Sequence, residues 1–231
     1  MPDGGVYVPP ADWTFEAGPH CLRPGDFIPC VNGEEVNRWT TSENHALYVA
    51  RDSAGQKPHY HTGGANGRPY VEFDGINDLL HNDTWPDHTW QCTYFIVAHP
   101  DEQMSKGILL NYHSKLSFRA AASDSFPHSA GLYSGTFLDV MWTTPHTPQL
   151  TTYALNLTGG TWNAWLNNTD THNGVMIDPV VTDHFVIGGD EIFNTGYLKG
   201  RVYEIRRYPA VLTAPQREQV QEELRVKYAL W

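Results

Sequence analysis

Residues 70–78 read YVEFDGIND, a short strand pattern that ends in a turn signal. Successive side chains of a strand point to opposite faces, so Glu72 and Asp74 share one face and Phe73 lies on the other. Asp74-Gly75 is a common turn pair, because Asp hydrogen-bonds its own backbone and Gly adopts positive φ. The stretch therefore predicts a half-buried β-strand closed by a tight turn.

The same alternation of short apolar runs and turn residues continues along most of the chain. Residues 93–98, TYFIVA, are apolar throughout, as expected for a strand buried on both faces. The pair Gly159-Gly160 supplies the positive φ angles of a tight hairpin turn. The strands that we predict are Tyr70–Phe73, Trp90–Ala98, Gly107–Leu110, Lys115–Ala120, Leu138–Trp142, Thr151–Leu157, Thr161–Leu166, His184–Ile187 and Arg201–Tyr208.

One segment near the C-terminus has a helical pattern instead. Residues 213–216, TAPQ, match a capping box with proline in the first turn. Val220, Leu224 and Tyr228 follow at spacings of four and form one apolar stripe. The sequence therefore predicts an all-β protein with one C-terminal amphipathic helix.

Composition limits the classes of function. A chain of 231 residues suits one all-β domain, and a net charge of −11 argues against a broad nucleic-acid-binding surface. No apolar run approaches the ~20 residues of a membrane span, and the N-terminus has no basic start followed by an apolar run. We therefore expect a protein made in the cytoplasm without a signal peptide, with no membrane insertion.

A series of segments spreads along the chain: Val36–Trp39, Lys57–Tyr60, Asn66–Gly75, Asn77–Leu80, Thr93–Pro100, Ala164–Asn168, Lys199–Ile205 with Tyr208, and Lys227–Leu230. In this order and spacing they resemble the concanavalin A-like, laminin-G-like jelly-roll domains of bacterial and phage proteins. The resemblance implies an antiparallel jelly-roll β-sandwich over residues 36–231. Residues 1–35 are then an irregular N-terminal arm or edge segment. Such a signature specifies a fold better than an activity.

Glu72 and Asp74 also resemble part of the catalytic motif of laminarinase-type glycoside hydrolases, in which a jelly-roll strand presents the acids. A retaining glycosidase needs two carboxylates about 5 Å apart. That motif places a second Glu about four or five residues after the first, where this chain has Ile76 and Asn77. The next acid, Asp78, lies beyond the turn. We therefore expect no enzymatic activity.

Acidic residues at strand ends and turns make Ca²⁺ the first metal hypothesis, since related sandwiches bind Ca²⁺ through loop carboxylates. The alternative is that each carboxylate caps the backbone of its own turn. His59 and His61 share one strand face and form either a metal pair or an ordinary surface pair. The Ca²⁺ candidates are Asp74, Asp78, Asp139 and Asp190, and no other cofactor is expected.

Loop residues favour glycan binding, because aromatic rings and planar polar groups together suit a sugar. Alternation places Trp162 and Trp165 on opposite faces. One of the two is expected in the core, and the other is exposed or covered by the terminal helix or the arm. The glycan-binding candidates are Trp85, Asp87 and His88 in one loop, and Trp165 with Asn167, Asn168, Asp170 and His172 around a second loop over residues 167–174.

The chain has three cysteines, Cys21, Cys30 and Cys92. Cys92 lies next to the apolar run 93–98 and is expected to be a buried thiol. Cys21 and Cys30 could close a loop through a disulfide, and the sequence leaves that pairing open.

These observations leave three classes of function. The first is a non-enzymatic structural or surface-display protein of a virus particle, such as a phage minor tail or head-surface protein that contacts host glycans. Its N-terminal arm would dock on other copies or on neighbouring virion proteins. The second is a free glycan-binding lectin domain, with or without Ca²⁺. The third and weakest is a laminarinase-type hydrolase. We expect the first, which places the protein at a virion surface.

Overall fold

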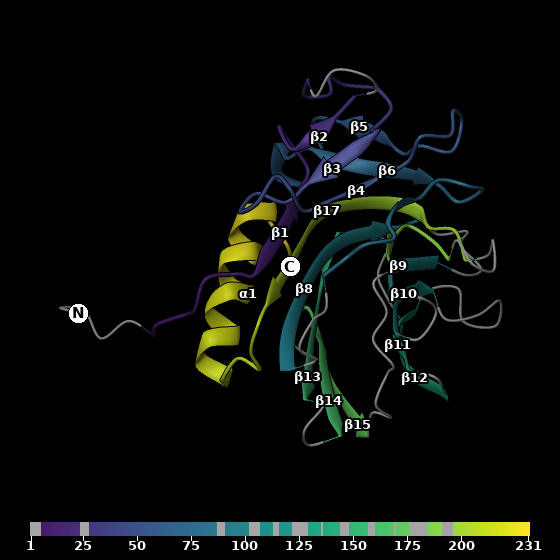
Figure 1. Ribbon diagram of the computed structural model, residues 1–231. Coiled ribbons are helices and arrows are strands. Elements are labelled where there is room, and N and C mark those ends of the chain that lie inside the picture. The colour runs from purple at the N-terminus through teal and green to yellow at the C-terminus, as the bar shows by residue number, and fades with distance from the viewer. Residues whose placement is uncertain are drawn as a thin grey trace.

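The computed structural model describes residues 6–23, 28–86, 91–101, 107–112, 116–121, 129–134, 136–143, 148–156, 160–168, 170–175, 184–190 and 196–231 (Figure 1). Within these ranges, the strands form two sheets that face each other. We call the two sheets A and B. One long helix, α1 (Ala214–Tyr228), covers the outer face of sheet A, and a short 3₁₀ turn, η1, spans Ala65–Gly67.

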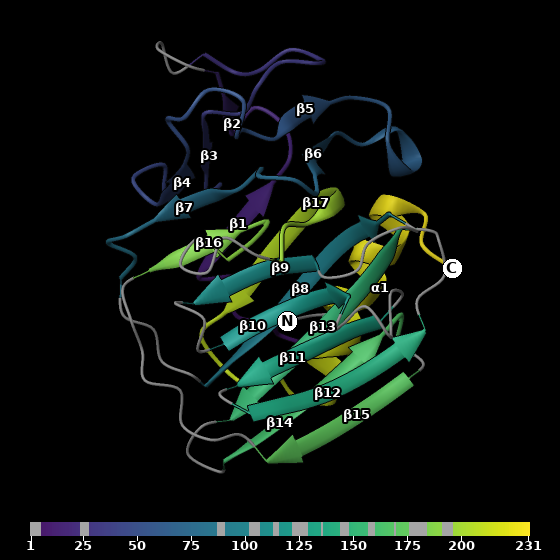
Figure 2. The ribbon, with the colours of Figure 1, turned by 90° about the vertical axis from the view of Figure 1, so that its right-hand side faces the viewer.

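Sheet A contains, in spatial order, β15 (Asp170–Val175), β14 (Thr161–Leu166), β13 (Gln149–Asn156), β8 (Gln91–Pro100), β17 (Lys199–Tyr208), β6 (Tyr70–Asp74) and β5 (His59–His61), and β1 (Trp13–Glu16) also pairs with β17. Sheet B contains β12 (Thr136–Thr143), β11 (Ser129–Ser134), β10 (Leu116–Ala121), β9 (Gly107–Tyr112), β16 (Phe185–Ile187), β7 (Leu80–Asn82), β4 (Tyr48–Ala50), β3 (Arg38–Thr40) and β2 (Cys21–Leu22). The described pairings are antiparallel. Figure 2 looks through sheet B onto sheet A, with β9–β12 in front of β13–β15.

The two sheets meet in an aromatic core. Tyr94 of β8 and Tyr112 of β9 join their hydroxyl groups at 2.9 Å across the sandwich. The Phe118 ring packs 4.7 Å from the Tyr153 ring, measured between centroids. Buried aromatic side chains contribute the largest apolar areas to a core. This packing confirms the predicted all-β sandwich, and the jelly-roll order of its connections stays a prediction.

A second apolar layer lies between sheet A and α1. Val220, Leu224 and Tyr228 are each at most 2% exposed and pack against side chains of β8 and β17. At the start of the helix, the backbone N of Thr213 donates to Gln216 Oε1 at 2.9 Å. Both observations confirm the helix that the sequence predicts, with its capping box and its apolar stripe.

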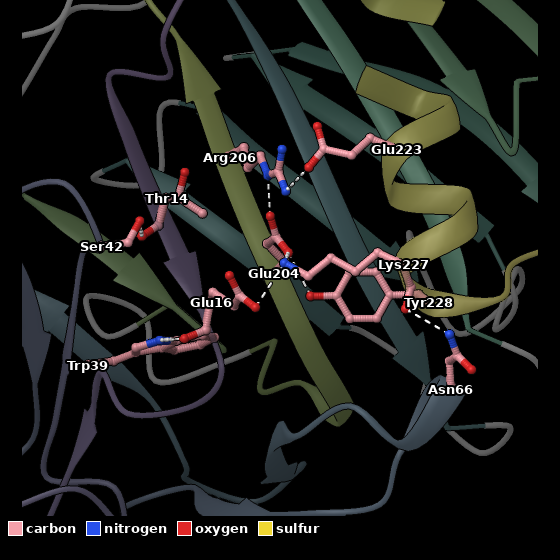
Figure 3. A network of polar contacts seen from close by, with 10 residues as sticks. All are labelled: Thr14, Glu16, Trp39, Ser42, Asn66, Glu204, Arg206, Glu223, Lys227 and Tyr228. Carbon is pink, nitrogen blue, oxygen red and sulfur yellow. Dashed lines mark hydrogen bonds and ion pairs between the residues drawn. The ribbon is translucent and has the colours of Figure 1, made fainter. Parts of the chain in front are cut away.

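A charged network on the outer face of sheet A fastens the end of α1 to β17 and β1 (Figure 3). Glu204 of β17 is 1% exposed, and its Oε2 lies 2.7 Å from Lys227 Nζ and accepts from Tyr228 OH at 2.6 Å. Lys227 Nζ also lies 2.8 Å from Glu16 Oε1. Burial alone would raise the pKa of Glu204, but the charges of Arg206 and Lys227 hold it below its ordinary value.

Part of the N-terminal segment, for which we expected an irregular arm or an edge segment, forms strands of the sandwich. β1 pairs with β17 over its full length, and Trp13 and Phe15 are fully buried in the core. β2 forms the edge of sheet B beside β3. Residues 13–16, WTFE, are too few to show the alternation of a strand. They nevertheless supply two core aromatic side chains, Trp13 and Phe15.

No helix among the described residues is both long and apolar enough to cross a membrane.

Candidate functional site

A cleft of about 450 Å³ opens on the outer face of sheet A, at β5, β6, β17 and the end of β8. Val71 and Phe73 of β6 are buried between the sheets, so the alternate residues Glu72 and Asp74 point outward into this cleft. The stretch of sequence with the strand-and-turn pattern therefore forms one wall of the cleft.

A row of polar side chains crosses the cleft. His59 of β5 lies opposite Glu72 of β6, Glu72 lies opposite Arg201 of β17, and Arg201 lies opposite His99 of β8. Paired positions on neighbouring strands point to the same face, which brings these four side chains into one line across four strands. Lys199 and Asp74 form the next pair along the strands.

Polar and charged contacts surround Glu72 and Arg201, and both side chains stay open to solvent. Glu72 Oε2 lies 3.2 Å from His61 Nε2, and Glu72 Oε1 lies 3.5 Å from Arg201 Nε. Lys199 Nζ lies 3.2 Å from Asp101 Oδ2. The side chains of Glu72 and Arg201 are each 41% exposed. The cleft therefore presents planar charged groups that a ligand can reach.

An aromatic flank borders the row. The His61 ring stacks on the Tyr70 ring with centroids 5.3 Å apart, and Arg201 Cζ lies 5.0 Å from the Tyr70 centroid. The Tyr70 ring also contacts Tyr203, whose hydroxyl accepts from the backbone N of Ala65 at 3.4 Å. Stacked rings of this kind offer apolar faces beside hydrogen-bonding groups.

Gly200 forms part of the cleft floor between Lys199 and Arg201. Its φ is +148°, and a Cβ at this position would lie 2.6 Å from the backbone O of His99. A side chain there would collide with β8, so only glycine allows the two strands to approach this closely.

The turn after β6 uses its carboxylates to hold the backbone. Asp74 Oδ1 accepts from the backbone N atoms of Ile76, Asn77 and Asp78 at 2.7, 3.2 and 3.3 Å. Asp78 Oδ2 accepts from the backbone N of Asp74 at 3.0 Å. Gly75 completes the turn with a φ of +78°. This arrangement matches the alternative in which turn carboxylates cap their own backbone.

Burial changes the acidity of Asp78, which is 4% exposed. Loss of solvent and the neighbouring negative charge of Asp74 raise the pKa of Asp78 to about 6.

The other two Ca²⁺ candidates are Asp190, which is buried, and Asp139, whose side chain lies outside the described residues. Within the described ranges, no group of three His, Cys, Asp or Glu side chains is arranged to hold a metal ion.

Trp85 is placed in the core, which corrects its selection as a glycan-binding residue. Its side chain is 1% exposed, and its ring packs 4.5 Å from Phe185 and 5.6 Å from Trp13. The ring is covered because the residues after β7 turn back into the aromatic core. Asp87 and His88 lie outside the described residues.

Trp162 and Trp165 lie on opposite faces of β14, as the alternation predicts. Trp162 is 3% exposed in the core. Trp165 is half-buried, with Arg217 Cζ of α1 only 4.1 Å from its ring centroid. The helix therefore covers the second tryptophan, which was one of the two alternatives.

The expected loop over residues 167–174 is a hairpin instead. Asn167 and Asn168 have φ angles of +47° and +61°, and β15 begins at Asp170 and pairs with β14. Asn167 Oδ1 accepts from the backbone N of Leu150 at 2.9 Å, so this amide supports the fold. Asn tolerates the left-handed conformation that such turns need, and this allows the strand to resume early. The side chains of Asp170 and His172 lie outside the described set.

The sequence matches no protein-family model and no curated protein. Solved structures do resemble the fold. Domain 4 of AbnA, a GH43 extracellular arabinanase from Geobacillus stearothermophilus, was solved in complex with arabinotriose. It is 15% identical, with a TM-score of 0.60, over 79% of this chain and 92% of that domain.

Two further structures are similar. A GH54 α-L-arabinofuranosidase soaked with a cyclic sulfate inhibitor is 10% identical, with a TM-score of 0.61, over 84% of this chain and 51% of that one. A Trypanosoma rangeli sialidase in complex with the inhibitor DANA is 12% identical, with a TM-score of 0.57, over 96% of this chain and 34% of that one. These likenesses support a β-sandwich without singling out the laminin-G-like or phage type.

Several cleft residues were not selected from the sequence as site residues. His99, Lys199 and Arg201 carried only the fold resemblance, and Glu72 was considered only as a catalytic acid. The signal that was available is the alternation in β5 and β6, which places His59 with His61 and Glu72 with Asp74. This alternation gives no information that β17 and β8 lie beside β5 and β6.

Proposed function

We propose that this chain is a non-catalytic carbohydrate-binding domain that binds a glycan in the cleft formed by β5, β6, β17 and β8. The observation that carries the proposal is the His59–Glu72–Arg201–His99 row beside the Tyr70 flank. Carboxylate, guanidinium and imidazole groups suit the paired hydroxyl groups of a sugar, and a ring face suits its apolar side. The likeness to a domain solved with arabinotriose supports the same class of ligand.

The contacts of the cleft carboxylates favour binding over hydrolysis. Both oxygens of Glu72 already have partners, the imidazole of His61 on one side and the guanidinium of Arg201 on the other. Asp74 accepts from three backbone N atoms, and Asp78 is buried against the turn. A retaining glycosidase needs a nucleophile and an acid that both face the substrate.

Two observations favour a glycan-binding domain over a virion component that docks through an arm. Residues 13–16 are built into sheet A, so this part of the expected arm is committed to the core. The similar structures named above are proteins or domains solved with sugar ligands or with glycosidase inhibitors.

Arg201→Ala tests the cleft. We expect a glycan array to identify ligands, with arabinotriose included, and calorimetric titration to show at least about a tenfold loss of affinity in this variant. The matched control is Arg225→Ala, which also removes an arginine paired with a glutamate, but on the exposed side of α1. The affinity of Arg225→Ala for the glycan should equal that of the wild type.

The same titration is repeated in buffer with calcium and in buffer with EDTA. Because the cleft holds the sugar through its own side chains, binding should be the same in calcium and in EDTA. The proposal is wrong if no glycan binds in either buffer, or if Arg201→Ala binds as tightly as Arg225→Ala. Thermal unfolding of both variants checks that they remain folded.

A further inference from the structure

Cys21 and Cys30 lie opposite each other in a short antiparallel ladder. The backbone N of Cys30 donates to the O of Cys21 at 2.8 Å, and the N of Arg23 donates to the O of Ile28 at 3.0 Å. Between these two bonds, Leu22 and Pro29 form an antiparallel bridge. Cys21 and Cys30 share one of the two hydrogen bonds of such a pair, since the N of Cys21 donates to the O of Gly18 at 3.1 Å. Opposite residues at a hydrogen-bonded position have Cα atoms about 5.5 Å apart, which is inside the range of about 4.4–6.8 Å that disulfides span.

The two side chains also share one side of this ladder. Both are free thiols, 0% and 7% exposed, and both belong to the core cluster that includes Trp39. Cys92 differs, because it lies on β8, where Arg207 and Tyr94 contact its thiol. The chain therefore contains one matched pair and one separate thiol.

We propose that Cys21 and Cys30 form a disulfide when the chain folds in the presence of a disulfide oxidant such as oxidised glutathione. The thiolate of one cysteine attacks the glutathione disulfide and releases one glutathione. The second cysteine then attacks the mixed disulfide and releases the other glutathione. The protein thiols lose two protons and two electrons, and one oxidised glutathione becomes two reduced molecules.

The timing of this reaction follows from burial. Loss of solvent raises the pKa of the Cys30 thiol to about 12 and raises that of Cys21 well above its ordinary value. The reactive thiolate is therefore scarce once the core has closed. The bond forms during folding, and the folded reduced protein reacts slowly.

The disulfide would brace the segment that supports β5. After Cys30 the chain runs beside β5, where the N of Gly33 donates to the O of Tyr60 and the N of Tyr60 donates to the O of Glu34, both at 2.8 Å. Glu35 forms an antiparallel bridge with His59, a residue of the cleft wall. The covalent link is thus close to the cleft, although its formation does not depend on the proposed function.

The experiment compares wild-type protein refolded with oxidised and reduced glutathione against protein refolded with a phosphine reductant. Titration of thiols in denaturant should find only Cys92 after oxidative refolding, and all three cysteines after reductive refolding. Peptide mapping should recover residues 21 and 30 in one linked species. The oxidised form should unfold at a temperature higher by roughly 5 °C, because the link restricts the unfolded chain.

Two variants complete the test. Cys92→Ser should form the same link and leave no free thiol, whereas Cys30→Ser should lose both the link and the oxidant-dependent shift. The proposal is overturned if three thiols remain after oxidative refolding, or if the recovered link includes Cys92. Because the main comparison uses the wild-type chain in two redox states, it does not depend on the folding of a variant.

Discussion

Asp78 lies at the buried end of the turn after β6, where its Oδ2 accepts a hydrogen bond from the backbone N of Asp74. The position needs an acceptor but is unfavourable for a charge, because solvent is lost and Asp74 is close by. The sequence signal Asp74-Gly75 was sufficient to predict the turn. The burial of Asp78 was not predictable, since it depends on how distant strands pack over it.

Asp78→Asn should stabilise the protein at neutral pH. The pKa of Asp78 is about 6 in the folded state against an ordinary value of 3.8, so the contribution of Asp78 to stability is fully present below about pH 4 and is lost as pH rises from about 4 to about 6. Asparagine keeps an acceptor and removes the charge. The variant should gain about 2 kcal/mol relative to the wild type between pH 4.5 and pH 7.5.

Urea unfolding at the two pH values measures this gain. Asp52→Asn, at an exposed loop position, is the matched control and should show no such pH-dependent gain. Equal behaviour of the two variants would show that the charge of Asp78 has no unfavourable effect on the fold.

At the scale of secondary-structure elements, α1 is held by an apolar stripe and by the charged network around Glu204. Its start and its buried face were both predictable, since a capping box and a spacing of four are local patterns. The network was not, because Glu16, Glu204 and Lys227 come from three different elements. The short strands β2 to β5 and β7 escaped prediction because two or three residues carry no period.

Lys227→Met should destabilise the attachment of α1. The change leaves Glu204 buried with one cation fewer, and it also removes the link to Glu16. Loss of one member of a buried charged group costs about 3 kcal/mol, measurable as a lower urea midpoint. The control is Arg225→Met, since Arg225 lies on the same helix in an exposed pair with Glu222. It should leave the midpoint unchanged, and a similar loss in both variants would count against the network.

At the scale of the whole molecule, one core runs from the first described strand to the last. The alternating pattern predicted an all-β protein and the family resemblance implied a sandwich, but neither could assign strands to sheets or locate the cleft. Glu72 and Arg201 are 129 residues apart and meet only through the pairing of β6 with β17. Register over such separations is set by three-dimensional packing, so the position of the cleft was beyond the reach of local patterns.

Trp13→Ala tests whether the N-terminal segment is part of the fold. Trp13 is fully buried against Phe15, Trp85 and Phe185, so its truncation should cost about 3–5 kcal/mol in the free energy of unfolding. Trp231→Ala is the matched control, because that side chain is 51% exposed and should be nearly silent. If Trp13→Ala were equally silent, these residues would act as a separate arm after all.

The pairing of β17 with β8, β6 and β1 also determines the order in which the protein can be completed during synthesis. Asp12 and Arg207, which form an ion pair in the finished molecule, are 195 residues apart. Until the ribosome has made β17, β1 has no neighbour in sheet A and β8 has one open edge. The nascent chain must therefore keep β1 unpaired through most of translation, a period in which an unpaired strand edge is exposed to aggregation and to chaperones.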